Sequence, residues 1–258
     1  MNDRGVSDTL GFVFVFAIIL STVAVVTTIG MAGLQDTRDV ERVNNAERAF
    51  DILGDNMEDI ADRGAPSRAT EVKVEEARLY LDTPVEFVIS GELTTDSSVN
   101  FTNTYEVSPV VYEADTSEER LVYVFDALLR TRGNSGTFVR TPSLVLTQDR
   151  VLIPAFVTRP DESATTAVGG SGTFLVRADK AASNVLAARS EGQYDVNITV
   201  RSPRAALWRD ELSRRPDVTC DPVVAPATSD DYPSVSCYVD GAERVYVVST
   251  AVDLTFAD

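Results

Sequence analysis

The chain has 258 residues, and its 40 acidic residues outnumber its 23 basic residues to give a formal net charge of −17. Such a chain has no basic patch to displace counterions from phosphate, which argues against nucleic-acid binding. The sequence contains no histidine, which excludes Ser-His-Asp and Cys-His catalysis and most zinc and haem sites. Dense acidic charge with almost no lysine is typical of a protein that stays soluble in saturating salt.

The first predicted element is an apolar segment without formal charge over residues 10–29. About 20 residues at ~1.5 Å each cross the ~30 Å hydrocarbon core of a bilayer. Three interpretations are open. A secretory signal peptide would be cut near residues 30–33, and a plain single-pass anchor would keep its N-terminus. In the third interpretation the processing site precedes the apolar segment, which stays on the mature protein.

The third interpretation depends on Arg4-Gly5-Val6-Ser7, which ends two residues before the apolar segment. This arrangement resembles the class III signal of type IV pilins and archaellins, and most of all that of haloarchaeal pilin-like proteins. The resemblance implies that a prepilin peptidase cuts after Gly5 and makes Val6 the new N-terminus. Bacterial pilins usually carry glutamate at the fifth mature position, where this chain has Leu10, so the similarity is to archaeal members.

Ser7 and Asp8 follow the implied new N-terminus. Asp8 is the one ionisable group at the expected membrane edge, and two roles are open for it. It either pairs with the N-terminal amine of a neighbouring subunit or is stabilised by the dipole of its own helix. By the positive-inside rule, Arg4 favours a cytoplasmic N-terminus and an extracellular remainder.

The helix is expected to continue beyond the membrane segment, because apolar residues recur there at alternating spacings of three and four. Gly64 and Pro66 then predict its end. The repeating positions either cover a sheet of the same chain or form a coiled coil with a partner. These positions are Val43, Ala46, Phe50, Leu53, Met57 and Ile60.

Beyond this helix the pattern alternates with a period of two, which predicts short β-strands separated by turn residues. Strands are expected at 70–75, 78–81, 85–89, 105–112, 121–125, 151–158, 173–177, 194–200 and 244–256. A short helix is expected over 203–212, with Ser202 as its N-cap, and Trp208 is expected to seat it on the sheet. A further helical turn or two is expected over 181–188.

The predicted fold class is therefore α+β, with a long N-terminal transmembrane and amphipathic α-helix followed by a mainly antiparallel β-sandwich-like domain. The expected parts are a leader (1–5), a helix (6–63) with membrane (10–29) and amphipathic (36–62) portions, and an extracellular β-rich domain (68–258).

Four residues are candidates for covalent modification. Cys220 and Cys237 are expected to form a disulfide in an exported domain, with two buried free thiols as the alternative. Asn100 and Asn197 each begin an Asn-x-Thr sequon and are candidates for glycosylation. Two long loops, 159–172 and 214–236, are candidate interaction surfaces.

The sequence predicts neither an active site, a cofactor nor a metal site, so an enzymatic role is not expected. The favoured hypothesis is a pilin-like structural subunit, anchored in the cell membrane with its β domain outside and able to enter a cell-surface filament. Its expected partners are membrane lipid, prepilin peptidase, and like subunits or other pilins through the N-terminal helix. The alternative is a single-pass cell-surface binding or adhesion protein that does not polymerise.

Overall fold

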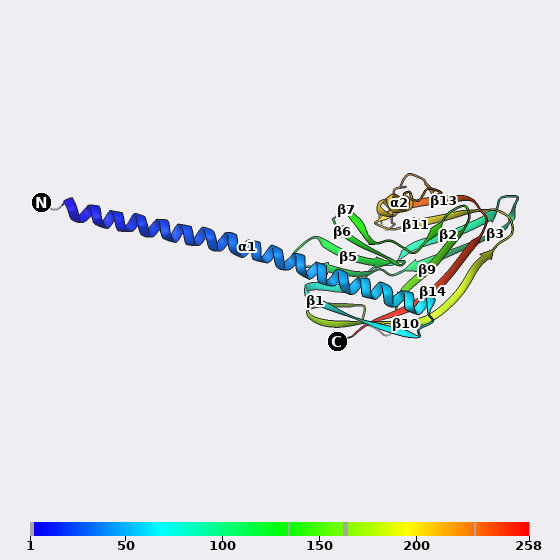
Figure 1. Cartoon of the computed structure of the whole chain (residues 1–258), viewed down its shortest axis with the longest axis horizontal. Coiled ribbons are helices and arrows are strands. Elements are labelled where there is room, and N and C mark those ends of the chain that lie inside the picture. Colours follow the sequence, from blue (N-terminus) through cyan, green and yellow to red (C-terminus); the bar gives the residue numbers. More distant parts are fainter. Residues whose placement is uncertain (1–2, 134, 162–164, 230, 258) are drawn as a thin grey trace. The chain divides into compact units, whose positions relative to one another are not determined.

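The computed structural model describes residues 3–133, 135–161, 165–229 and 231–257 (Figure 1). The chain forms two compact units, residues 1–44 and residues 45–258. Helix α1 (Asp3–Asp62) begins in the first unit and ends in the second.

Within the first unit, α1 runs without interruption through Gly30. It starts at Asp3, three residues before the expected start, so the described part of the expected leader is helical. The side-chain hydroxyls of Thr22 and Thr28 each donate a hydrogen bond of 2.8 Å to the backbone carbonyl four residues earlier. These bonds satisfy two side-chain hydroxyls of the apolar segment within the helix itself, which suits an apolar environment.

In the second unit, the last part of α1 packs on the β domain. Asn56 Nδ2 donates to Thr70 Oγ1 at 2.8 Å, and Lys180 Nζ donates to the carbonyl of Ile60 at 3.3 Å. The repeating apolar positions from residue 46 onward are at most 1% exposed: Ala46, Phe50, Leu53, Met57 and Ile60. The expectation that the helix covers a sheet of its own chain is confirmed. The helix ends where predicted, with Gly64 at φ +70°.

The larger sheet has nine strands within the described residues, in the order β7-β6-β5-β4-β1-β10-β14-β9-β8. Its neighbours pair antiparallel except for β14 and β9, which are parallel. The strands are β1 (Ser67–Leu81), β4 (Val110–Ala114), β5 (Glu119–Val124), β6 (Ala127–Arg132), β7 (Ser135–Arg140), β8 (Val145–Leu146), β9 (Val151–Pro160), β10 (Ala167–Arg189) and β14 (Val245–Ala257).

The smaller sheet is antiparallel and has five strands in the described part of the chain, in the order β12-β13-β11-β2-β3. They are β2 (Val85–Leu93), β3 (Asp96–Val107), β11 (Tyr194–Arg201), β12 (Thr219–Cys220) and β13 (Ser234–Ala242). Figure 1 shows this sheet and the last part of α1 on opposite sides of the larger sheet.

The larger sheet is therefore a middle layer, and its strands β4, β5 and β6 are largely buried on both faces. On β5, Val122 packs into the core shared with Phe87 of the smaller sheet. Its neighbours Leu121 and Tyr123 are fully buried on the opposite face. This arrangement confirms the α+β class and the sandwich-like pairing of two sheets, and adds α1 as a third layer.

A partly buried ion cluster links α1 to the larger sheet. The guanidinium of Arg140 on β7 contacts Asp55 at 2.8 Å and Glu58 at 2.6 Å, both on α1. Its Nε lies 3.9 Å from Asp126, which is 1% exposed. Burial raises the pKa of the Asp126 carboxyl despite this neighbouring cation. Gly54 leaves room for the cluster, since a Cβ there would lie 3.0 Å from the guanidinium.

The expectation of a helical turn over 181–188 was wrong. These residues belong to β10, where Ser183 pairs with Thr250 of β14. Alanine-rich sequence favours helix locally, but pairing with a long neighbouring strand overrides that preference.

The sequence pattern did not predict β6, β7, β8, β12 and β13, and it predicted only a small part of β3 and β10. Strands β5 and β6 are joined by the two-residue turn Phe125-Asp126, with φ of 51° and 63°. Phenylalanine is unusual at positive φ, but Phe125 is buried and stacks on Phe87 with ring centroids 4.1 Å apart. Tertiary packing therefore sets this turn.

The predicted short helix is present as α2 (Ala205–Leu212), two residues shorter at its start. Ser202 does not cap it; its Oγ accepts a hydrogen bond from the Arg204 amide at 3.1 Å, within the turn before the helix. Trp208 is 1% exposed and packs edge-on against Phe87 and Phe138, each at 5.2 Å. The prediction that Trp208 seats this helix on the sheets is confirmed.

The two expected loops are shorter than predicted. Residues 214–236 contain β12 and the start of β13, and residues 159–172 contain the end of β9 and the start of β10. Residues 162–164 of the second loop lie outside the described residues.

Candidate membrane anchor and surface groove

The residues of the predicted processing site are consecutive positions at the start of α1. Arg4, Gly5, Val6, Ser7 and Asp8 all have helical backbone. Their roles in processing and assembly remain predictions.

The apolar segment of α1 is longer than expected by two residues and extends over Leu10–Met31. None of it is buried inside the protein; Phe12 is 70% exposed and Ile29 is 68% exposed. An apolar surface of this extent needs an apolar environment. The segment has the length and composition of a membrane span or of a signal sequence.

The two cysteines are brought together as expected. Cys220 of β12 and Cys237 of β13 are direct cross-strand partners, and their sulfur atoms lie at the bonding distance of 2.08 Å. The pair ties the short edge strand β12 to the smaller sheet. The alternative of two free thiols is excluded in this structure.

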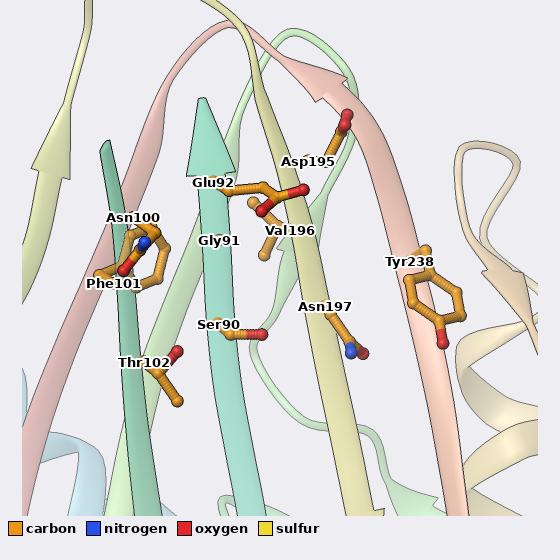
Figure 2. Close-up of a pocket in the computed structure, with 10 residues that line it drawn as sticks. All are labelled: Ser90, Gly91, Glu92, Asn100, Phe101, Thr102, Asp195, Val196, Asn197 and Tyr238. Atoms are coloured by element: carbon orange, nitrogen blue, oxygen red, sulfur yellow. The ribbon is translucent and has the colours of Figure 1, made fainter. Parts of the chain in front are cut away.

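The outer face of the smaller sheet carries a groove with a volume of about 440 Å³ (Figure 2). Both sequon asparagines line it, together with residues for which the sequence gave no signal. Its lining comprises Ser90, Gly91, Glu92, Asn100, Phe101, Thr102, Asp195, Val196, Asn197 and Tyr238.

The strand register places the polar lining residues in two rows across the sheet. In the first row, Glu92 of β2 is opposite both Asn100 of β3 and Asp195 of β11. The carboxylates of Glu92 and Asp195 make this end of the groove negative, and in Figure 2 the Glu92 side chain reaches from β2 toward β11.

The second row is uncharged. Ser90 of β2 is opposite both Thr102 of β3 and Asn197 of β11, and Asn197 is in turn opposite Tyr238 of β13. The row presents the hydroxyls of Ser90 and Thr102, the amide of Asn197 and the phenol of Tyr238. The Tyr238 hydroxyl donates to Asp221 Oδ2 at 2.8 Å, which fixes the ring and raises the pKa of this phenol.

The remaining contacts make the groove a preformed feature. Asp195 Oδ1 accepts a hydrogen bond from the Gly241 amide at 2.8 Å. Phe101 points to the other face of β3, and its ring packs where Gly91 has no side chain; a Cβ at Gly91 would lie 2.6 Å from that ring. Hydroxyl, amide and carboxylate groups beside a fixed aromatic ring can hydrogen-bond and stack on a polar ligand.

In the part of the chain that the structure describes, no cluster of three or more metal-binding side chains is present.

The fold and these features define a class: an α+β protein with an N-terminal apolar helix suited to a membrane and a disulfide-bearing, mainly β domain. The model of a family of unknown function, DUF7289, matches residues 4–255, and the chain belongs to that family. No curated protein and no solved structure matches the chain.

Proposed function

We propose that the protein is a pilin-like exported subunit of a halophilic archaeon. In this proposal a peptidase hydrolyses the Gly5–Val6 peptide bond, α1 stays in the membrane through Leu10–Met31, and the β domain is displayed outside the cell. The subunit then enters a filament in which the apolar parts of neighbouring α1 helices pack together.

One observation carries the proposal. A single uninterrupted helix, Asp3–Asp62, begins with an exposed apolar surface and ends with one apolar face buried against the β domain. A helix built in this way joins a membrane anchor to a folded domain without a linker. Cleavage at Gly5–Val6 removes only the first residues of that helix, whereas cleavage after the apolar segment would separate the anchor from the β domain.

Two further features support export. The cysteines are paired, and disulfides persist in oxidising compartments outside the cytoplasm. The net charge of −17 suits a domain in contact with concentrated salt. Processing would create a positively charged amine on Val6, and the Asp8 carboxylate would be the oppositely charged partner of that amine on a neighbouring subunit.

The test is expression of the full chain in a halophilic archaeal host, followed by separation of membranes from filaments sheared off the cells. Arg4→Ala and Gly5→Leu should leave an unprocessed precursor in the membrane. Arg38→Ala is the matched control, since Arg38 is an exposed basic residue of the same helix beyond the apolar segment. It should be processed and reach the sheared fraction like the unaltered protein.

Normal processing of both Arg4→Ala and Gly5→Leu would contradict the proposed cleavage. A processed protein that stays in the membrane and never enters sheared material would instead indicate the non-polymerising display protein.

A further inference from the structure

The two sequons lie in different structural settings. Asn100 is on β3, the edge strand of the smaller sheet, and pairs on one side only. Asn197 is on β11, the central strand of that sheet, which pairs with both β13 and β2. A transferase that binds an acceptor segment can displace an edge strand at a lower free-energy cost than a central strand. Displacing a central strand breaks two ladders of backbone hydrogen bonds, whereas displacing an edge strand breaks one.

The side chains of the Asn100 sequon are also more accessible than those of the Asn197 sequon. Asn100 and Thr102 are both exposed. Asn100 donates a local hydrogen bond, from its Nδ2 to the Ser97 carbonyl at 2.9 Å. Asn197 and Thr199 are half-buried, and the Thr199 hydroxyl is hydrogen-bonded to Ser236 Oγ at 2.7 Å. The hydroxyl that a sequon must offer to a transferase is therefore exposed beside Asn100 and engaged beside Asn197.

The groove extends from Asn100 across the sheet. A group attached to Asn100 Nδ2 would have Glu92 and Asp195 in its own row, and Asn197 and Tyr238 in the next. Figure 2 shows these side chains on the same side of the strands as Asn100. Sugars present hydroxyl groups to such carboxylate and amide partners and apolar ring faces to an aromatic ring, and the volume of about 440 Å³ lies in the usual range for small-ligand sites.

We propose that Asn100 carries an N-linked oligosaccharide whose first sugars lie in this groove, and that Asn197 is unmodified and covered by them. The inference rests on the proposed export of the β domain. The donor is an oligosaccharide joined through its anomeric carbon to a lipid-linked phosphate. The amide nitrogen of Asn100 bonds to that carbon, the carbon–oxygen bond to phosphate breaks with its electron pair leaving on the phosphate oxygen, and the amide loses one proton to a base of the transferase.

The test is mass spectrometry of the full-length protein and its peptides after purification from a halophilic archaeal host. The peptide that contains Asn100 should carry a glycan, and the peptide that contains Asn197 should have its unmodified mass. Asn100→Gln and Thr102→Ala should abolish the added mass, and Thr102→Ser, which keeps the hydroxyl, should retain it. Asn197→Gln is the matched control and should keep the full added mass.

A second measurement tests the position of the glycan. Amide hydrogen exchange around residues 90–92 and 195–197 should be slower in the glycosylated protein than in Asn100→Gln. Equal exchange would overturn the seating in the groove.

Failure of the inference can be told apart from failure of the proposed function by adding protease to intact cells. A protease-accessible β domain without glycan on Asn100, or with glycan on Asn197, would overturn this inference alone. A protected, unglycosylated domain would overturn both.

Discussion

Replacing Leu53 with alanine tests whether the last part of α1 is a structural layer of the β domain. Leu53 is 0% exposed, whereas its neighbour Ile52 is 54% exposed on the same helix. Removing a fully buried leucine side chain costs about 2–5 kcal/mol, because it loses transfer free energy and leaves a cavity. Ile52→Ala is the matched control, and should change the free energy of unfolding by less than about 1 kcal/mol.

The assay is urea unfolding of the full chain in detergent, followed by fluorescence of Trp208, the only tryptophan. Trp208 belongs to the core between the two sheets, so it reports on a layer that Leu53 does not share. With a slope of about 2 kcal/mol per molar urea, Leu53→Ala should lower the midpoint by roughly 1–2.5 M. Equal midpoints for the Leu53 and Ile52 variants would refute the packing of α1 on the domain.

Three further changes test the domain itself. Asp126→Asn should stabilise the protein at neutral pH: burial raises the pKa of this carboxyl, so the folded state loses stability as pH rises through the raised value, and the asparagine does not. Urea midpoints should therefore converge below the ordinary aspartate pKa and diverge above it, and a pH-independent difference would contradict the assignment. The double variant Cys220→Ser/Cys237→Ser should lose about 3 kcal/mol of stability, as expected for a bridge closing a short loop, and reductant should lower the midpoint of the unaltered protein but not of the variant. Gly91→Val should lower the thermal midpoint because the Phe101 ring occupies the space of the new side chain, and an unchanged midpoint would show that the ring does not pack there.

Much of the fold follows from periodicity in the sequence. The spacing of Phe50, Leu53 and Met57 predicts the buried face of α1, and strict alternation predicts the last strand, β14. Gly64 correctly marks the end of the helix. These patterns are local in the sequence, and the periodic ones repeat often enough to indicate one type of secondary structure.

The elements that the sequence analysis did not predict share a physical cause, which is packing between segments far apart in the chain. The larger sheet is covered on both faces around β6, so the sequence of β6 is a short apolar segment without alternation. The Phe125-Asp126 turn lacks the Asn-Gly or Asp-Gly sequence typical of two-residue hairpins, because stacking on Phe87 stabilises it instead. The helical expectation for 181–188 failed because pairing with β14 outweighs the local preference of alanine.

The groove could be predicted only in part. Its two sequons, at Asn100 and Asn197, are visible in the sequence, but nothing local indicates that they share one face. Strand register brings Glu92, Asp195 and Tyr238 beside them, and register across four strands is not encoded in any short segment.

The central claim is that the apolar part of α1 stays on a protein that is processed before it. The most direct test is to determine the N-terminus of the protein from membrane and sheared-surface fractions by mass spectrometry. The account predicts a mature chain that begins at Val6. A chain that begins beyond Gly30, or that keeps residues 1–5, would contradict it.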